Sequence, residues 1–177
     1  PEKMVDELKE IDIEPVISIW PTVNQKSENF KEMKEKDLFI HKKDNSITSH
    51  KTFVDGYPPD EADLFVYDAI NPDAREYIWN KIKKNYYNKG IKAFWLDAME
   101  PEVDTSQFKF HLGSGEKIGN LYPLKHSEVF YKNMKKEGQN KILNLCRSGW
   151  IGSQRYGAAI WSGDIPSTFE SLQKQVR

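Results

Sequence analysis

Short apolar runs alternate with longer segments of helical periodicity along this chain, and each run stops abruptly at a polar residue or a proline. The strand-like runs lie at residues 16–20, 91–96, 141–146 and 158–161. Parallel strands need connections of helical length, so this alternation predicts an α/β fold built on a parallel sheet.

Capping residues mark the helices between these runs. Asn71 followed by a proline is typical of a helix start, and Gly90 is typical of its end. Pro123 opens the next helix. Ser167 with Glu170 three residues later predicts a capping box at the start of the last one.

Two stretches are too long for ordinary connections of an α/β unit. Residues 24–63 contain a polar helical segment at 28–36 and a hairpin-like tract at 38–47, with a turn expected at Asp44-Asn45. Residues 101–122 are rich in glycine, but the glycine spacing does not match a dinucleotide-binding loop. We interpret both as insertions into one domain that spans residues 1–177.

Composition excludes several classes of protein. A net charge of −1 over 177 residues argues against a nucleic-acid binder, and no stretch approaches the roughly 18 apolar residues of a membrane helix. Cys146 is the single cysteine, which excludes an internal disulfide and a cysteine zinc site. The N-terminus lacks a signal-peptide pattern, so a cytoplasmic location is expected. The chain starts without Met and ends within a helical pattern, so we expect a piece of a longer protein.

Functional groups gather where the predicted strands end. Trp20, Asp97, Arg147 and Asp164 lie at or just beyond the four carboxyl ends, where active sites of parallel α/β folds are found. Two carboxylates suit glycoside hydrolysis, in which one attacks or stabilises and the other donates a proton. Indole faces stack on the C–H faces of sugar rings, and three further tryptophans lie in or near the same ends: Trp95, Trp150 and Trp161.

Each of these residues also has a structural interpretation. Asp97 could cap a helix, Arg147 could form a structural salt bridge, and single tryptophans are more often core residues than sugar platforms. Cys146 has no His or Asn partner nearby in the sequence, so it is expected to be buried and not nucleophilic.

A metal site is the other use of the acidic residues. Hard oxygen ligands for magnesium could come from four residues after the second strand, namely Asp97, Glu100, Glu102 and Asp104. No phosphate-binding loop accompanies them, so this alternative is disfavoured. The four histidines lack metal-ligand spacing and are expected at the surface or in loops: His41, His50, His111 and His126.

Three motifs together resemble glycoside hydrolase family 31, the α-glucosidase and α-xylosidase family. The segment Phe94-Trp-Leu-Asp-Ala-Met-Glu-Pro101 is similar to the nucleophile motif of that family. Arg147-Ser-Gly-Trp-Ile-Gly-Ser-Gln-Arg155 resembles its arginine segment, and Trp161-Ser-Gly-Asp164 its acid/base motif. The strand that ends at Pro21 resembles the one that carries a sugar-facing tryptophan.

The resemblance implies a fold and a role for each residue. The chain would hold about strands three to six of a (β/α)8 TIM barrel, with loop insertions. Asp97 would be the catalytic nucleophile and Asp164 the general acid/base, protonated near neutral pH because burial and a nearby charge raise its pKa. The −1 subsite would be formed by Arg147, Trp161, Trp20 and Trp95, with Glu100 orienting its neighbours.

The implied activity is that of a retaining glycoside hydrolase that needs no cofactor or metal. It would cleave terminal α-linked glucose or xylose from an oligosaccharide or other α-glycoside. The sequence Ala98-Met99-Glu100-Pro101 is closer to the α-xylosidase and glucosyltransferase-like branches, which leaves the sugar open. An α-glucosyltransferase of the same family and a non-catalytic carbohydrate-binding domain are the alternatives.

Overall fold

The computed structural model describes residues 2–47, 49, 51–55 and 60–176. The helices of this part are α1 (Glu2–Glu10), α2 (Glu28–Glu35), α3 (Pro72–Asn85), α4 (Gly115–Ile118), α5 (Leu121–Lys136) and α6 (Phe169–Gln175). The strands are β1 (Val16–Ile19), β2 (Thr22–Asn24), β3 (His41–Lys42), β4 (Lys51–Asp55), β5 (Asp60–Val66), β6 (Ala93–Leu96), β7 (Phe108–Phe110), β8 (Gly113–Ser114), β9 (Asn144–Cys146) and β10 (Ala158–Ile160).

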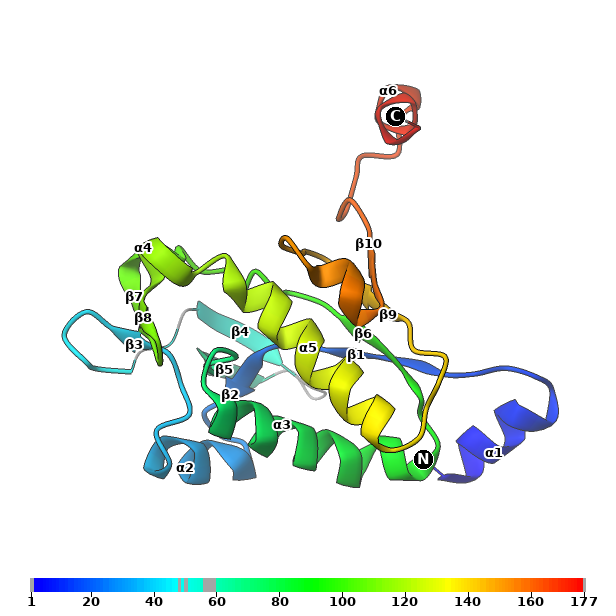
Figure 1. Cartoon of the computed structure of the whole chain (residues 1–177), viewed down its shortest axis with the longest axis horizontal. Coiled ribbons are helices and arrows are strands. Elements are labelled where there is room, and N and C mark those ends of the chain that lie inside the picture. The colour runs from blue at the N-terminus through cyan, green and yellow to red at the C-terminus, as the bar shows by residue number, and fades with distance from the viewer. Residues whose placement is uncertain (1, 48, 50, 56–59, 177) are drawn as a thin grey trace.

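The four strands predicted from the apolar runs form one sheet in the order β1-β6-β9-β10. All three neighbouring pairs are parallel, with Val16 opposite Ala93 and Phe94 opposite Asn144. The predicted α/β fold with a parallel sheet is therefore confirmed. The long helices α3 and α5 lie side by side along this sheet (Figure 1).

One face of the sheet packs against these helices. Phe94, Leu96 and Cys146 point to that face and are fully buried. Phe130 of α5 is also fully buried, and its ring centroid lies 5.3 Å from that of Phe94. Burial of a large apolar side chain contributes about 1.5–3 kcal/mol, so this layer holds α5 on the sheet.

The opposite face is different. Val16, Trp95 and Leu145 alternate with the buried residues along the strands, and they remain 55%, 38% and 40% exposed. Because side chains alternate between the two faces of a strand, the register puts these three on the side away from α3 and α5. The sheet thus presents an apolar face that the described residues leave open.

The two predicted insertions meet in the structure. The predicted turn in 38–47 forms, with Lys42 donating a backbone hydrogen bond to Ser46 at 2.8 Å. The strand before this turn, β3, pairs antiparallel with β7 of the second insertion. The partner strand of the hairpin-like tract therefore comes from another part of the chain. β2, β5 and β4 form a third, antiparallel sheet.

A second core lies between these insertions and the helices, and it corrects one expectation. His126 lies on α5 and is fully buried, not at the surface or in a loop, because this face of α5 packs against Tyr67. The Tyr67 hydroxyl lies 2.5 Å from His126 Nδ1, and burial lowers the histidine pKa to about 3. Of the other histidines, His41 and His111 are on a strand and a turn, and His50 lies outside the described residues.

Helix starts differ slightly from prediction. Asn71 caps α3 as expected, accepting a hydrogen bond from the Asp73 backbone. α5 starts at Leu121, which leaves Pro123 in the first turn, where no helical N–H bond is lost. The predicted capping box at Ser167 is wrong by one residue: Thr168 has the extended backbone of a cap and accepts from the Ser171 N–H.

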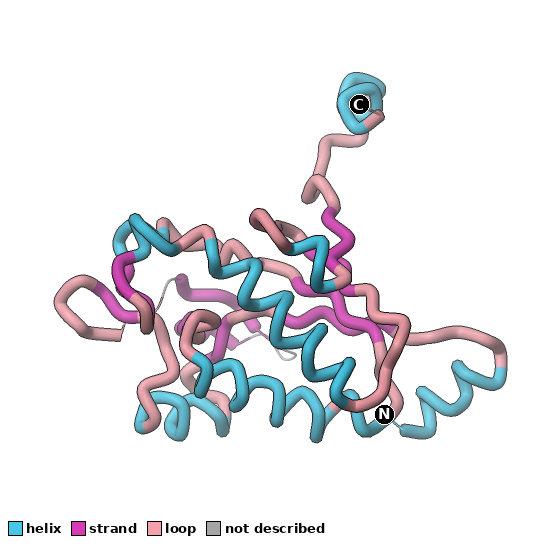
Figure 2. Tube along the Cα trace, viewed as in Figure 1, coloured by secondary structure: helices cyan, strands magenta, loops and turns pink. Residues whose placement is uncertain are grey.

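After β10 the chain leaves the rest of the molecule. Figures 1 and 2 show α6 apart from the other helices and the sheet, connected to β10 only by a loop. Its apolar side chains are exposed, Phe169 by 88%. We call residues 161–176 the C-terminal segment. Among the described residues no helix combines the length and the apolar character needed to cross a bilayer.

Candidate active site

The predicted functional residues lie along one edge of the parallel sheet, which we call the carboxyl edge. Backbone hydrogen bonds extend the strand pairing past the strand ends: Asp97 N donates to Ile19 O, Arg147 N to Leu96 O and Trp161 N to Cys146 O, at 3.2–3.3 Å. Trp20, Asp97, Arg147 and Trp161 therefore follow one another across neighbouring strands. Three of the four residues predicted at the strand ends, Trp20, Asp97 and Arg147, thus lie in sequence along this edge, and Trp161 takes the place next to Arg147 where Asp164 was expected.

Asp97 is held at this edge by its own turn. Its carboxylate is largely buried, and Oδ1 accepts the Ala98 N–H at 2.8 Å. Oδ1 also lies 3.4 Å from Nη1 of Arg147. The guanidinium is therefore the cation nearest to this carboxylate among the ion pairs of the described residues.

Arg147 is bound more tightly by two glutamates. Its Nε lies 3.0 and 3.1 Å from the two oxygens of Glu100, and Nη2 lies 2.7 Å from Glu100 Oε2. Nη2 also contacts Glu102 Oε1 at 2.7 Å. The hydrogen bonds that Arg147 donates to Glu100 and Glu102 raise the pKa of the guanidinium above its ordinary value, although partial burial opposes the shift.

The turn that presents these carboxylates is strained at both ends. Ala98 and Glu102 have φ angles of 51° and 64°, in the left-handed region that disfavours residues other than glycine. Such positions cost about 1–3 kcal/mol each and persist where surrounding contacts determine them. Here the contacts are those of Asp97, Glu100 and Glu102 with Arg147.

This cluster bears on the magnesium alternative. The guanidinium of Arg147, a cation supplied by the protein, lies among Asp97, Glu100 and Glu102. Asp104 has a different role: it accepts hydrogen bonds from the Ser106 backbone and hydroxyl and caps the 3₁₀ helix Thr105–Gln107. Within the part of the chain that the structure describes, no group of three acidic, His or Cys ligands is arranged to hold a metal ion.

The tryptophans are only partly brought together. Trp95 and Trp161 pack edge to face with ring centroids 5.7 Å apart, on the open side of the sheet. Trp20, at the end of β1, lines a separate cavity of about 530 Å³ with Thr22, Asn24 and Leu64. Trp150 is exposed in the loop after Arg147.

Asp164 is the clear disagreement with the expected site. It lies in the C-terminal segment, its side chain is exposed, and within the described residues it forms no hydrogen bond or ion pair. The expected burial of this carboxyl is therefore wrong for the chain as it stands. The physical reason is that β10 is the edge strand of the sheet and the segment after it has little to pack against.

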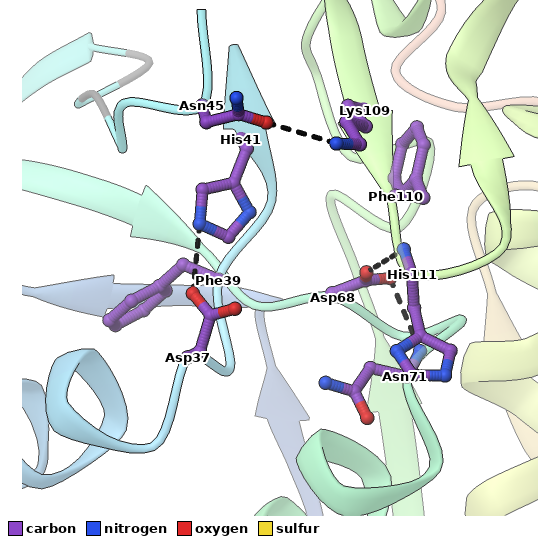
Figure 3. Close-up of a pocket in the computed structure, with 9 residues that line it drawn as sticks. All are labelled: Asp37, Phe39, His41, Asn45, Asp68, Asn71, Lys109, Phe110 and His111. Carbon is purple, nitrogen blue, oxygen red and sulfur yellow. Dashed lines mark hydrogen bonds and ion pairs between the residues drawn. The ribbon is translucent and has the colours of Figure 1, made fainter. Parts of the chain in front are cut away.

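A second polar cavity lies between the two insertions (Figure 3). It has a volume of about 430 Å³, and its polar groups already have partners: His41 binds Asp37, and Lys109 binds Asn45. The buried Asp68 accepts backbone hydrogen bonds from Ile70, Asn71 and His111, at 2.6–3.3 Å. Asp68 thus connects the second insertion, through His111, to the start of α3.

Sequence reasoning missed two of these residues. Glu102 was considered only as a metal ligand, although a glutamate two residues after Glu100 could reach the same arginine. Asp68 was not singled out, although an aspartate three residues before the helix cap Asn71 is typical of a turn that binds backbone N–H groups.

Comparisons with known proteins identify the family of this chain. The model of the glycosyl hydrolases family 31 TIM-barrel domain matches residues 1–177. A crystal structure of a GH31 α-xylosidase from a soil metagenome, in complex with xylose, superposes with a TM-score of 0.88 and 44% identity, covering 99% of this chain and 25% of that one.

Two curated relatives cover the same span. The family 31 glucosidase ORF2 of Pseudescherichia vulneris, named as uncharacterized, is 38% identical over 179 residues, which is 99% of this chain and 32% of the relative. The α-xylosidase of Saccharolobus solfataricus is 30% identical over 184 residues, 99% of this chain and 22% of the relative.

The chain thus spans between 22% and 32% of the length of these proteins. The parallel sheet with its helices is accordingly a partial barrel, as the resemblance implied. Since the family model matches from the first residue to the last, the chain belongs to glycoside hydrolase family 31 and forms part of its TIM-barrel domain.

Proposed function

We infer that this chain carries the nucleophile of a retaining α-glycosidase that releases terminal α-linked xylose or glucose. The observation that supports this most is the placement of Asp97, buried at the carboxyl edge beside Arg147, within a chain that matches the family model throughout. Relatives named α-xylosidase, one of them in complex with xylose, make an α-xyloside the first substrate to test.

The proposed reaction has two displacements. Asp97 attacks the anomeric carbon as the bond to the leaving oxygen breaks, and Asp164 gives that oxygen a proton. Asp164 then takes a proton from water, whose oxygen attacks the anomeric carbon and releases Asp97. The sugar leaves with its original anomeric configuration.

Asp164 can take this role only where its carboxyl lies across the sugar from Asp97, at the short carboxyl separation of retaining enzymes, about 5–5.5 Å. The relatives are several times longer than the chain, so the surroundings of the C-terminal segment in a protein of that length belong to the proposal. Burial of the Asp164 carboxyl in those surroundings would suit its role as proton donor.

The remaining residues would bind the sugar in the −1 subsite. Arg147 and Trp161 contact it, Trp95 packs against Trp161 and lines the same side, and Trp20 closes the subsite from the end of β1. Glu100 orients Arg147 through its two-oxygen contact. No cofactor takes part in this scheme.

Residues 24–63 and 101–122 are, in this proposal, excursions of the one barrel domain. Their support is mutual: β3 pairs with β7, and Lys43 forms an ion pair with Glu116 at 3.1 Å. A cytoplasmic location stays a prediction of the sequence, which cell fractionation would test.

The test compares two carboxyl variants of the full-length protein on two α-xylosides, one with an activated aryl leaving group and one with a sugar leaving group. Asp97→Asn should lose at least about 1,000-fold in kcat on both, because no nucleophile remains. Asp164→Asn should lose as much on the sugar leaving group, but its glycosylation rate on the activated aryl xyloside should stay within about tenfold, since that departure needs no proton.

Retention of configuration, followed by NMR of the first-formed product, is the companion measurement. Turnover by the Asp97→Asn variant at the wild-type rate, or a product of inverted anomeric configuration, would exclude Asp97 as the nucleophile of a retaining enzyme. Saccharide binding without any hydrolysis would instead favour a carbohydrate-binding role. Transfer of the sugar to a saccharide acceptor in preference to water would identify a glucosyltransferase-like enzyme.

A further inference from the structure

The guanidinium of Arg147 is divided unequally among three carboxylates. Glu100 and Glu102 bind it at 2.7–3.1 Å through Nε and Nη2, within the range of charge-assisted hydrogen bonds. Asp97 faces only Nη1, at 3.4 Å, which is too long for such a bond. The arginine is therefore near the proposed nucleophile without binding it closely.

Glu102 has the geometry to cause this. Nη2 has two N–H groups; one faces Glu100 Oε2, and the second faces Glu102 Oε1. With both committed, the guanidinium plane is fixed on the side of the glutamates. Glu102 has a positive φ, and its side chain reaches Arg147 from the surface, with 28% of the side chain exposed.

We propose that Glu102 is a positioning residue that holds Arg147 back from Asp97, so that the guanidinium does not bind the nucleophile closely. This rests on the proposed role of Asp97. A carboxylate that accepts a close hydrogen bond from arginine is a weaker nucleophile and binds protons less readily. Glu102 thereby sets both the reactivity of Asp97 and the acid limit of activity.

The charged groups around Asp97 are few in the described residues. Arg147 comes from the end of β9, and Glu100 and Glu102 from the turn after β6, in contact through Arg147. From β1, the neighbouring strand, Ile19 binds the Asp97 backbone and carries no charge. Cys146, before Arg147, is neutral because burial raises its pKa to about 11. The exposed Asp164 follows β10.

The experiment measures kcat/KM against pH for Glu102→Gln in the full-length protein. Glutamine keeps the shape but loses the charge that draws Nη2, so the guanidinium should move onto Asp97. The acid limb, which reports the free enzyme's carboxylate, should shift to lower pH by about half a unit to one unit. We expect kcat at the optimum to fall about tenfold with little change in KM, because the loss is confined to the attacking step.

Glu116→Gln is the matched control. It removes the same charge from an ion pair with Lys43 in which both side chains are 59% exposed, and it should leave the acid limb and kcat unchanged. Glu102→Asp keeps the charge but shortens the reach, so its acid limb should lie between those of the wild type and Glu102→Gln. This variant also serves if Glu102→Gln does not fold.

An acid limb that stays in place in both Glu102 variants overturns the proposal, whatever happens to the melting temperature. A lower melting temperature alone would make Glu102 a structural partner of Arg147. Failure of the proposed function is a separate result, because it shows as turnover by Asp97→Asn and does not depend on Glu102.

Discussion

The two proposed catalytic carboxylates lie in regions of opposite character. Asp97 follows a strand in the middle of the sheet, where its turn, a neighbouring strand and Arg147 hold it in place. Asp164 follows the edge strand β10, in a C-terminal segment most of whose side chains after Trp161 are exposed. The surroundings of Asp97 are therefore formed within this chain, whereas Asp164 lies exposed at its surface.

The difference follows from where the partners of each region lie in the sequence. The segment around Asp97 finds its partners within the chain: Ile19 precedes it by many residues and Arg147 follows it. In a closed barrel an edge strand would have another strand beside it. The chain spans a third or less of its curated relatives, so such partners for β10 can be supplied by a longer protein.

Two phenylalanines provide the strongest test of this contrast. Phe130 is fully buried on α5 against Phe94 and Trp79, whereas Phe169 on α6 is 88% exposed. Phe130→Ala should lower the free energy of unfolding of the 177-residue chain by about 3–5 kcal/mol, and Phe169→Ala by less than about 0.5 kcal/mol. Urea denaturation followed by tryptophan fluorescence measures both. Equal losses would mean that α6 packs onto the rest of the chain.

The buried histidine makes the body of the chain sensitive to acid. Burial lowers the pKa of His126 from 6.5 to about 3, so between these values the unfolded state binds the proton more tightly. Stability should therefore fall as the pH drops below 6.5, by about 2–3 kcal/mol down to pH 4.5. His126→Gln removes the titration and should flatten the curve there. In this variant the side-chain oxygen of the glutamine can accept a hydrogen bond from the Tyr67 hydroxyl, which contacts Nδ1 of His126 in the wild type.

The control for this pH effect is His111→Gln, at an exposed turn. It should leave the pH dependence of stability as it is in the wild type. A wild-type chain that is equally stable at pH 6.5 and 4.5, after correction for its carboxylates, would contradict the burial of His126.

Removal of Arg147 tests the carboxyl edge directly. Arg147→Met leaves Asp97, Glu100 and Glu102 close together without their shared cation. We expect a loss of about 2 kcal/mol in the free energy of unfolding, since hydrogen bonds to charged groups are worth about 1.5–3 kcal/mol and part of the repulsion is screened by solvent. Lys174→Met, which removes the partner of Glu170 in α6, should change nothing measurable. Chemical denaturation at low salt compares the two, and equal effects would remove the contrast.

How far the sequence could predict these regions depends on the range of the interactions. The strand after Ile91 and the helix after Asn71 were predictable, because an apolar run and a cap are local signals. That Trp20, Asp97 and Arg147 share one edge was also predictable, because parallel strands place their carboxyl ends at the same edge of a sheet.

Long-range partners were not predictable in this way. His41 of β3 pairs with Lys109 of β7, and nothing local to either segment indicates the other. The burial of His126 depends on Tyr67, which comes from the insertion side of the chain. The exposure of Asp164 reflects which strand neighbours are present, and that is a property of the whole barrel rather than of the motif around the residue.

The same motif occurs in both regions and gives the smallest and most closely matched test. A glutamate and a lysine four residues later pair as Glu128–Lys132 on α5 and as Glu170–Lys174 on α6. The side chain of Glu128 is only 9% exposed and that of Glu170 is 75% exposed. Burial raises the pKa of Glu128, but hydrogen bonds from Lys125 and Lys132 outweigh it and lower the pKa from 4.5 to about 2.

A carboxyl group whose pKa is lowered in the folded state stabilises the fold at pH values above its pKa in the unfolded chain. For Glu128 that contribution is lost as the pH falls from about 4.5 to about 2. Glu128→Gln should therefore cost about 1 kcal/mol at pH 7 and almost nothing at pH 2, whereas Glu170→Gln should have no measurable effect at either pH, because exposed pairs are screened by solvent. The measurement is the free energy of unfolding of the three proteins at both pH values. If the two variants behave alike at pH 7, then sequence spacing and not burial decides the strength of such a pair, and the contrast between the two regions is weaker than their packing indicates.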